Sequence, residues 1–255
     1  MTDINVLHYV LFFFTGLAAG TVDAIAGGGG LITVPVLLST GMPAPIVLGT
    51  NKLGAVFGTA SSSWMYDQKG AVTLRDCRLG ITITALASIG GACTASLMSS
   101  DFLGRVIPWL LGAIVILAAF RPNLGAAPAR RTLARLPFYL LCGAVLGFYD
   151  GFFGPGVGTF WMVAFVFLLG LDFLKASAHA RVMNFASNAA ALGVFALAGK
   201  VLMVPGLTLG AGQLIGGRLG ASIAVTRGAR FVRPIFLVMA GLTVLKLIYD
   251  RHFQP

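Results

Sequence analysis

Two aspartates stand beside glycine-rich breaks in apolar segments, where a carboxylate is unusual. Asp23 precedes the glycine run 27–30 in the stretch GTVDAIAGGGGLITVP, and Asp150 stands in a second version, GFYDGFFGPGVGT, half a chain later. An ionised carboxylate among apolar residues costs roughly 3 kcal/mol or more unless it is paired, hydrated or protonated. Each aspartate therefore needs a partner or a proton.

Two cations supply candidate partners. Lys52 stands in LGTNKLG and Arg181 in AHARVMN, each just inside an apolar segment. Two cations and two carboxylates would form a charge-compensated centre. It could bind an anion beside Lys52 and Arg181, while Asp23 or Asp150 takes up a proton or forms an ion pair. The alternative is two structural salt bridges that hold helices together.

The glycine breaks could bind an anion through their backbone. Irregular backbone at membrane depth is tolerated where it is buried in protein or lines a wet cavity. Its free N–H groups, and a helix beginning near Leu31, favour negative charge. The second break offers the same groups, although Pro155 lacks one donor. Close helix packing is the alternative for glycines. We expect it for four scattered ones, Gly90, Gly91, Gly216 and Gly217.

Amides and one histidine stand near the cations. Asn51, Asn184 and Asn188 add amide donors. His179 could titrate near neutral pH, with a helix-capping or interfacial role as the alternative. The other two histidines lie near the ends of the chain, so no metal site is predicted. The three cysteines, Cys77, Cys93 and Cys142, have no CxxC spacing, and we expect no metal or redox role for them.

Composition places the chain in a bilayer. Hydrophobic residues make up 57%, charged residues 10%, and the mean hydropathy is +0.91. The first apolar run lacks the features of a cleaved signal peptide, so we expect it to be retained. The net charge of +10 falls mainly in short loops, as the positive-inside effect requires, which argues against nucleic-acid binding. No hydrolase, nucleotide-binding or zinc-protease motif indicates an enzyme.

The apolar segments form two similar series. The first series is expected at 4–22, 31–40, 46–66, 79–98 and 102–120, and the second at 136–149, 158–171, 178–198, 201–226 and 231–249. The motif IGG with AS recurs at an offset of 126 residues, Asp23 and Asp150 at 127, and Lys52 and Arg181 at 129. A duplication follows, with repeats at 1–120 and 136–255 joined by a basic cytoplasmic linker at 121–135.

Loop charges predict inverted halves. If each glycine break is the tip of a hairpin that leaves on the side it entered, 11 loop Lys and Arg residues lie on one side and 3 on the other. If each broken segment crosses once, the split is 9 to 5. The first topology places a larger share of the basic loop residues on one side, which would be the cytoplasmic side. It gives each half an odd number of crossings and puts both termini outside. How far the hairpin arms reach stays open.

The motifs VDAIAGGGGLITVP, LGTNKLG, GFYDGFFGPGVGTF and AHARVMNFASN together resemble the sulfite exporter TauE/SafE family, most closely its YfcA-like branch. The similarity runs from about residue 13 to 249. It implies a permease of the bacterial inner membrane whose substrate is sulfite, a sulfonate or a related sulfur-containing anion. Matched positions that it carries over are Asp23, Gly27, Gly28, Gly29, Gly30, Thr50, Asn51, Lys52, Asp150, Gly154, Pro155, Gly156, His179, Arg181 and Asn184. Arg181 replaces the lysine of many relatives, which changes the donor geometry.

The predicted protein is an all-α integral membrane protein with two inverted halves, each a broken hairpin followed by three transmembrane helices. We expect a secondary transporter that moves a small anion by alternating access, without a cofactor. A passive anion channel and a non-transporting membrane scaffold are the alternatives. Direction of transport, proton coupling, stoichiometry and homo-oligomerisation stay open.

Overall fold

The computed structural model describes residues 5–106, 109 and 133–227, and every regular element among them is a helix. In chain order these are α1 (Val6–Ala26), α2 (Gly30–Leu38), α3 (Ala44–Gln68), the 3-10 helix η1 (Leu74–Cys77), α4 (Arg78–Leu97), α6 (Arg135–Phe138), the π-helix η2 (Tyr139–Gly143), α7 (Ala144–Phe152), α8 (Val157–Leu169), α9 (Phe173–Leu197) and α10 (Met203–Arg227). The expected spans at 102–120 and 231–249, and the C-terminus, lie largely or wholly outside these residues.

The described helices suit a bilayer. Three stretches, Val6–Ala26, Leu74–Leu97 and Phe173–Leu197, are long and apolar enough to cross a membrane. Helices α3 and α10 have 25 residues each, or about 38 Å at 1.5 Å per residue. Large apolar side chains such as Leu86, Val145 and Leu219 point outward. The expected all-helical structure is confirmed among the described residues, and it is compatible with a helical membrane protein.

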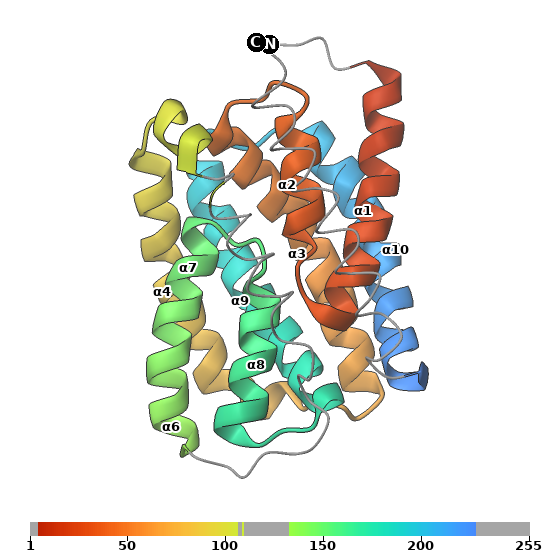
Figure 1. Cartoon of the computed structure of the whole chain (residues 1–255), viewed down its shortest axis with the longest axis vertical. Coiled ribbons are helices and arrows are strands. Elements are labelled where there is room, and N and C mark those ends of the chain that lie inside the picture. Colours follow the sequence, from red (N-terminus) through yellow and green to blue (C-terminus); the bar gives the residue numbers. More distant parts are fainter. Residues whose placement is uncertain (1–4, 107–108, 110–132, 228–255) are drawn as a thin grey trace.

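Two broken hairpins enter the molecule from opposite ends (Figure 1). Helix α1 descends from the upper end to about the middle, and α2 returns upward. The continuous stretch α6, η2 and α7 rises from the lower end, and α8 returns downward. Each turn uses two glycines with positive φ: Gly27 (81°) and Gly28 (99°), then Gly154 (97°) and Gly156 (80°). Because L side chains rarely adopt this conformation, glycine is needed at both breaks.

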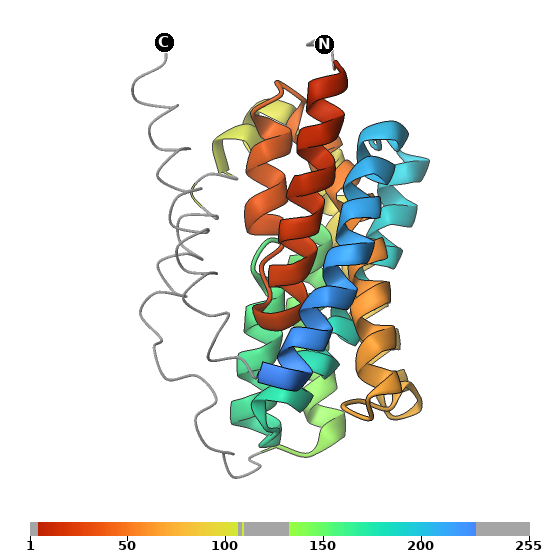
Figure 2. The same cartoon turned by 90° about the vertical axis from the view of Figure 1, so that its right-hand side faces the viewer.

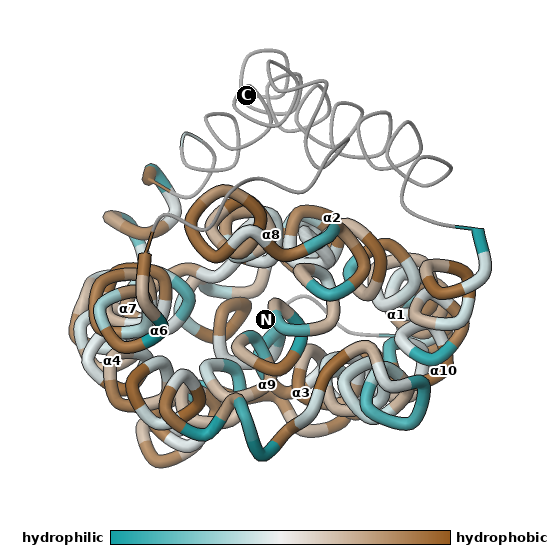
Figure 3. The backbone as a smooth tube through the Cα atoms, turned by 90° about the horizontal axis from the view of Figure 1, so that it is seen from below, coloured by the Kyte–Doolittle hydropathy of each residue, from teal (hydrophilic) through white to brown (hydrophobic). Residues whose placement is uncertain are grey.

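The two series of helices interlock. In Figure 3, α3 and α9 lie between a group formed by α4 and α7 and a group formed by α1 and α10. They run in opposite directions along the long axis (Figure 1). The first hairpin packs through α1 on α10, as Figure 2 shows from the side, and the second packs through α7 on α4. Each hairpin thus leans on a helix from the other series.

Glycines allow these helices to approach closely. A Cβ on Gly91 of α4 would lie 2.0 Å from the carbonyl oxygen of Phe148, and one on Gly151 of α7 would lie 2.0 Å from that of Ser88. Gly216 and Gly217 of α10 meet the backbone of α1 and α3 in the same way. The packing role expected for three of the scattered glycines is confirmed, whereas Gly90 makes only ordinary contacts.

Gly151→Ala is expected to destabilise the protein by about 1–3 kcal/mol, because the α4 backbone cannot move away without disturbing both helices. Gly193→Ala is the matched control, since nothing lies within 4 Å of a Cβ there and alanine favours a helix. Thermal unfolding in detergent should show a lower midpoint for Gly151→Ala alone. Equal midpoints would show that the α4–α7 contact tolerates a methyl group.

Basic residues gather at the lower end of the molecule. Helix α3 ends there, α4 and α9 begin there, and α10 ends there (Figure 1). These ends carry Lys69, Arg75, Arg78, Lys175 and Arg227. Lys200 follows the end of α9 at the opposite end. The membrane topology inferred from the loop charges stays a prediction.

Candidate functional site

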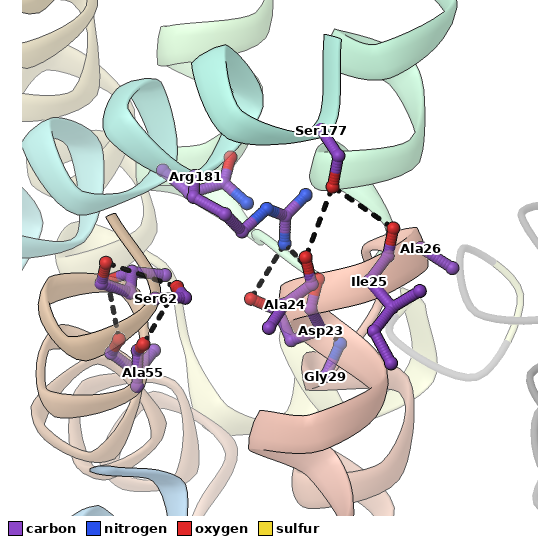
Figure 4. A network of polar contacts seen from close by, with 12 residues as sticks. Asp23, Ala24, Ile25, Ala26, Gly29, Ala55, Ser62, Ser177 and Arg181 are labelled. Carbon is purple, nitrogen blue, oxygen red and sulfur yellow. Dashed lines mark hydrogen bonds and ion pairs between the residues drawn. The ribbon is translucent and has the colours of Figure 1, made fainter. Parts of the chain in front are cut away.

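Asp23, near the end of α1, forms an ion pair with Arg181 of α9 (Figure 4). Nη1 of Arg181 lies 2.8 Å from Oδ2 of Asp23 and donates to its backbone oxygen at 2.5 Å. The other carboxylate oxygen accepts a hydrogen bond of 3.0 Å from the N–H of Gly29, across the first break. Asp23 therefore occupies one backbone donor at the start of α2, the N–H of Gly29, that an anion could also use.

Asp150, near the end of α7, forms the second ion pair with Lys52 of α3. Nζ of Lys52 lies 2.6 Å from Oδ1 of Asp150 and 2.5 Å from its backbone oxygen. Both cations thus bind a carboxylate and a carbonyl at a helix C-terminus, where the helix dipole also favours positive charge. The pairing is crossed, since each cation binds the aspartate of the other series of helices rather than that of its own.

The two pairs differ in how completely their groups are used. The third hydrogen bond of Lys52 goes to Oδ1 of Asn188 at 3.0 Å, so all three ammonium donors are occupied. The second carboxylate oxygen of Asp150 accepts from the hydroxyl of Ser187. The side chains of Lys52 and Asp150 are only 1% and 2% exposed. We call this pair closed, because its charged groups are fully hydrogen-bonded and almost inaccessible to solvent.

The Arg181–Asp23 pair, which we call the open pair, has hydrogen-bond donors that are not used. Arg181 is fully buried, yet its Nε and Nη2 have no hydrogen-bond partner among the described residues. The Asp23 side chain is 17% exposed. Because an unpaired buried donor costs about 1–3 kcal/mol, this guanidinium can gain from a further acceptor.

Side chains from other helices satisfy the remaining carbonyls at the end of α1. The hydroxyls of Tyr66 and Ser177 donate to the carbonyl oxygen of Ala24, and Ser177 also donates to that of Ile25. The hydroxyl of Thr159 donates to the carbonyl oxygen of Ala26. Helices normally leave their last four carbonyls without internal partners. Here α3, α8 and α9 fix the broken end of α1 in place.

A polar pocket lies where the two hairpin tips meet, with about 380 Å³ of space between atoms, open surroundings included. Its lining residues are Asp23, Gly28, Gly29, Gly30, Asn51, Lys52, Ala55, Asp150, Gly154, Gly156, Val157, Gly158, Asn184, Asn188 and Gln213. Both aspartates and most of the predicted site residues are thus brought together.

Four of the predicted site residues, and Pro155 of the matched motif, do not line the pocket. Arg181 lies behind Gly158, where an added Cβ would come within 2.3 Å of its Nη2. Gly27 packs on the backbone of Thr159. The hydroxyl of Thr50 accepts a hydrogen bond from the N–H of Leu202. The ring of His179 contacts Phe165, and its Nδ1 lies 2.8 Å from the carbonyl oxygen of Lys175.

Sequence reasoning missed Gln213 and Ser187. Gln213 is a lone amide in an apolar segment, a signal like the one that marked Asp23. Ser187 lies close to Asn184 and Asn188 but carries no charge to draw notice. Among the described residues no three His, Cys, Asp or Glu side chains could hold a metal ion together. The three cysteines are free.

Comparison with known proteins assigns the chain to a family. The family model for the sulfite exporter TauE/SafE matches residues 12–247. The probable membrane transporter protein YfcA of Escherichia coli K12 is 38% identical over 244 residues, 96% of this chain and 91% of the relative. A probable membrane transporter protein of Haemophilus influenzae is 41% identical over 254 residues, covering 98% and 100%.

A more distant relative, the probable membrane transporter protein YunE of Bacillus subtilis, is 26% identical over 273 residues, covering 97% and 100%. No solved structure matches the chain. The relatives are described as probable membrane transporters and not as enzymes, which agrees with the helical fold and with the charged residues buried between its helices. This chain therefore belongs to the sulfite exporter TauE/SafE family of membrane transporters.

Proposed function

We propose that this protein is a secondary transporter that carries a small sulfur-containing anion, such as sulfite or an organosulfonate, across the bacterial inner membrane by alternating access. The observation that carries the proposal is the crossed arrangement of Lys52–Asp150 and Arg181–Asp23 beside a polar pocket. Because each pair joins one repeat to the other, breaking and remaking it would accompany a movement between the repeats.

The repeats, at residues 1–120 and 136–255, are proposed to be inverted. The opposite entry of the two hairpins and the opposite directions of α3 and α9 support this (Figure 1). The basic end, together with the linker at 121–135, would face the cytoplasm. Transporters with inverted repeats bind their solutes near the middle of the membrane, at broken helices. The pocket at the hairpin tips has this position relative to the helices.

An anion is the solute that the unused donors favour. The N–H groups of Gly28 and Gly30 have no acceptor among the described residues. The unused Nε and Nη2 of Arg181 are enclosed behind Gly158, and we propose that a movement between the repeats brings them to the solute. The amide of Asn184 adds another donor at the same place. These groups could surround the oxygen atoms of a small oxyanion. Helix α2, which begins at Gly30, adds its dipole.

Charge balance supports coupling to a proton. The two cations and two carboxylates of the site cancel, so an anion would add one uncompensated charge to a buried place. Protonation of Asp23 would offset that charge. It would also weaken the hold of Asp23 on Arg181 and on the N–H of Gly29. We propose that the anion competes with the Asp23 carboxylate for Arg181 and for the N–H of Gly29. Once a proton is bound to Asp23, the anion can bind to these groups.

The choice of sulfur-containing anions rests on the family description, sulfite exporter TauE/SafE. The relatives compared above are described as probable membrane transporters, without a substrate. Sulfite, thiosulfate and ethanesulfonate are therefore the first solutes to test, with acetate as a carboxylate for comparison.

Purified protein in liposomes should carry at least one of these sulfur anions with saturable kinetics. Arg181→Ala should raise its KM about 10- to 100-fold, since a lost hydrogen bond to a charged group costs about 1.5–3 kcal/mol. Arg78→Ala removes an exposed arginine at the start of α4 and should leave KM unchanged. Equal KM values for wild type and Arg181→Ala would contradict the anion site. Unsaturable conductance would indicate a channel, and absence of flux a scaffold.

A further inference from the structure

Gln213 of α10 is a buried pocket residue with no counterpart in the repeated charge arrangement. It is 4% exposed and lines the pocket together with both aspartates. At the offset of 126 residues that relates α10 to α4, its equivalent is Ala87. The charged residues of the site are matched between the repeats, whereas Gln213 is an unmatched addition.

Glycines on two helices direct this side chain. Gly20 of α1 lies against the Gln213 backbone, where an added Cβ would come within 2.6 Å of its carbonyl oxygen. Gly54 and Gly58 of α3 lie against the carboxamide, with added Cβ atoms 3.1 Å from Nε2 and 2.8 Å from Oε1. The side chain therefore extends between α1 and α3, toward the pocket.

The carboxamide has no hydrogen-bond partner among the described residues, and neither of its polar atoms is wholly enclosed by protein. Other polar residues that line the pocket are already hydrogen-bonded: Asn51 with Thr33, Asn188 with Lys52, and Asp23 with Gly29. An amide left unpaired in an apolar interior is costly. Its partner must therefore come from the contents of the pocket.

We propose that Gln213 binds the transported anion directly, by donating its amide N–H to an oxygen of the solute, and thereby sets selectivity among oxyanions. This rests on the function proposed above. A carboxamide holds a neutral hydrogen-bond donor at a fixed place. Solutes with an acceptor at that place therefore bind more tightly than solutes without one. Because Gln213 forms no ion pair, it can be changed without breaking the crossed pairs.

Gln213→Leu keeps the shape of the side chain and removes its polar atoms. In liposomes, it should raise the KM for sulfite about tenfold, as expected for a lost hydrogen bond to a charged group, and keep the maximal rate. The ratio of the KM values for sulfite and ethanesulfonate should also change. Gln213→Asn, which withdraws the amide by one methylene, should act in the same direction and covers the case in which the leucine variant does not fold. Leu214→Ala, at an exposed neighbouring position of α10, should change neither value.

An unchanged KM and an unchanged selectivity ratio in a folded Gln213 variant, with normal wild-type flux, would overturn the assignment of Gln213 alone. Absence of flux of every sulfur anion in the wild-type protein would overturn the proposed function, and this inference with it. A loss of maximal rate at constant KM would show that Gln213 supports the movement of α10 rather than binding the solute.

Discussion

Lys52→Met is expected to abolish transport and to lower the free energy of unfolding by about 3–5 kcal/mol, the usual cost of removing one partner of a buried ion pair. The cause is Asp150, which would remain buried with its charge uncompensated and with Ser187 as its remaining side-chain partner. Thermal unfolding in detergent and anion flux in liposomes measure the two effects.

A double variant separates stability from function at this pair. Lys52→Met combined with Asp150→Leu replaces two charges with apolar side chains, which is often neutral or stabilising in a buried site. We expect recovered stability without recovered flux. Lys175→Met is the matched control, because its ion pair with Asp172 is exposed and worth about 0–1 kcal/mol. Normal flux in the double variant would show that the Lys52–Asp150 pair is only a structural brace.

Asp23→Asn is expected to separate solute movement from the proton gradient. Asparagine keeps one oxygen, which can accept from Arg181 or from the N–H of Gly29, and it cannot take up a proton. A difference of one pH unit stores about 1.4 kcal/mol, enough for a tenfold solute gradient if one proton moves with each anion. The variant should bring the anion only to equal concentrations on the two sides.

The measurement is accumulation of labelled sulfite in liposomes under an imposed pH gradient. Asp172→Asn, an exposed aspartate at the start of α9, should accumulate sulfite as the wild type does. Undiminished accumulation in Asp23→Asn would exclude Asp23 as the coupling group. A wild-type protein that ignores the gradient would remove proton coupling altogether.

The sequence contained enough to predict the charge centre, because each of its members is exceptional where it stands. A carboxylate inside an apolar segment must be compensated, so Asp23, Asp150, Lys52 and Arg181 could be grouped without knowing any contact. The breaks could be found for a similar reason, since a run of glycines interrupts a helix wherever it occurs. Helix bounds followed the apolar runs to within a few residues.

The partner of each aspartate could not be predicted. Lys52 and Asp150 are 98 residues apart, and Arg181 and Asp23 are 158 residues apart, so their meeting depends on how the hairpins cross between α3 and α9. The difference between the closed pair and the open pair depends on Ser187 and Asn188, whose types are ordinary for a membrane helix. His179 was misleading for a local reason. Two positions before Arg181, it lies on another face of α9 and contacts Phe165.

The crossed pairing also bears on how such a protein is made and how it arose. While the first repeat is in the membrane and the second is still being synthesised, Asp23 and Lys52 lack the partners on which their burial depends. The first repeat can reach its final arrangement only after Arg181 has been inserted, so the two repeats must mature together. Under the duplication and the inverted orientation proposed above, a single ancestral repeat would have lacked the same partners, and an oppositely oriented copy of itself would have supplied them. Joining two such copies into one chain would then have turned a contact between two chains into an internal one.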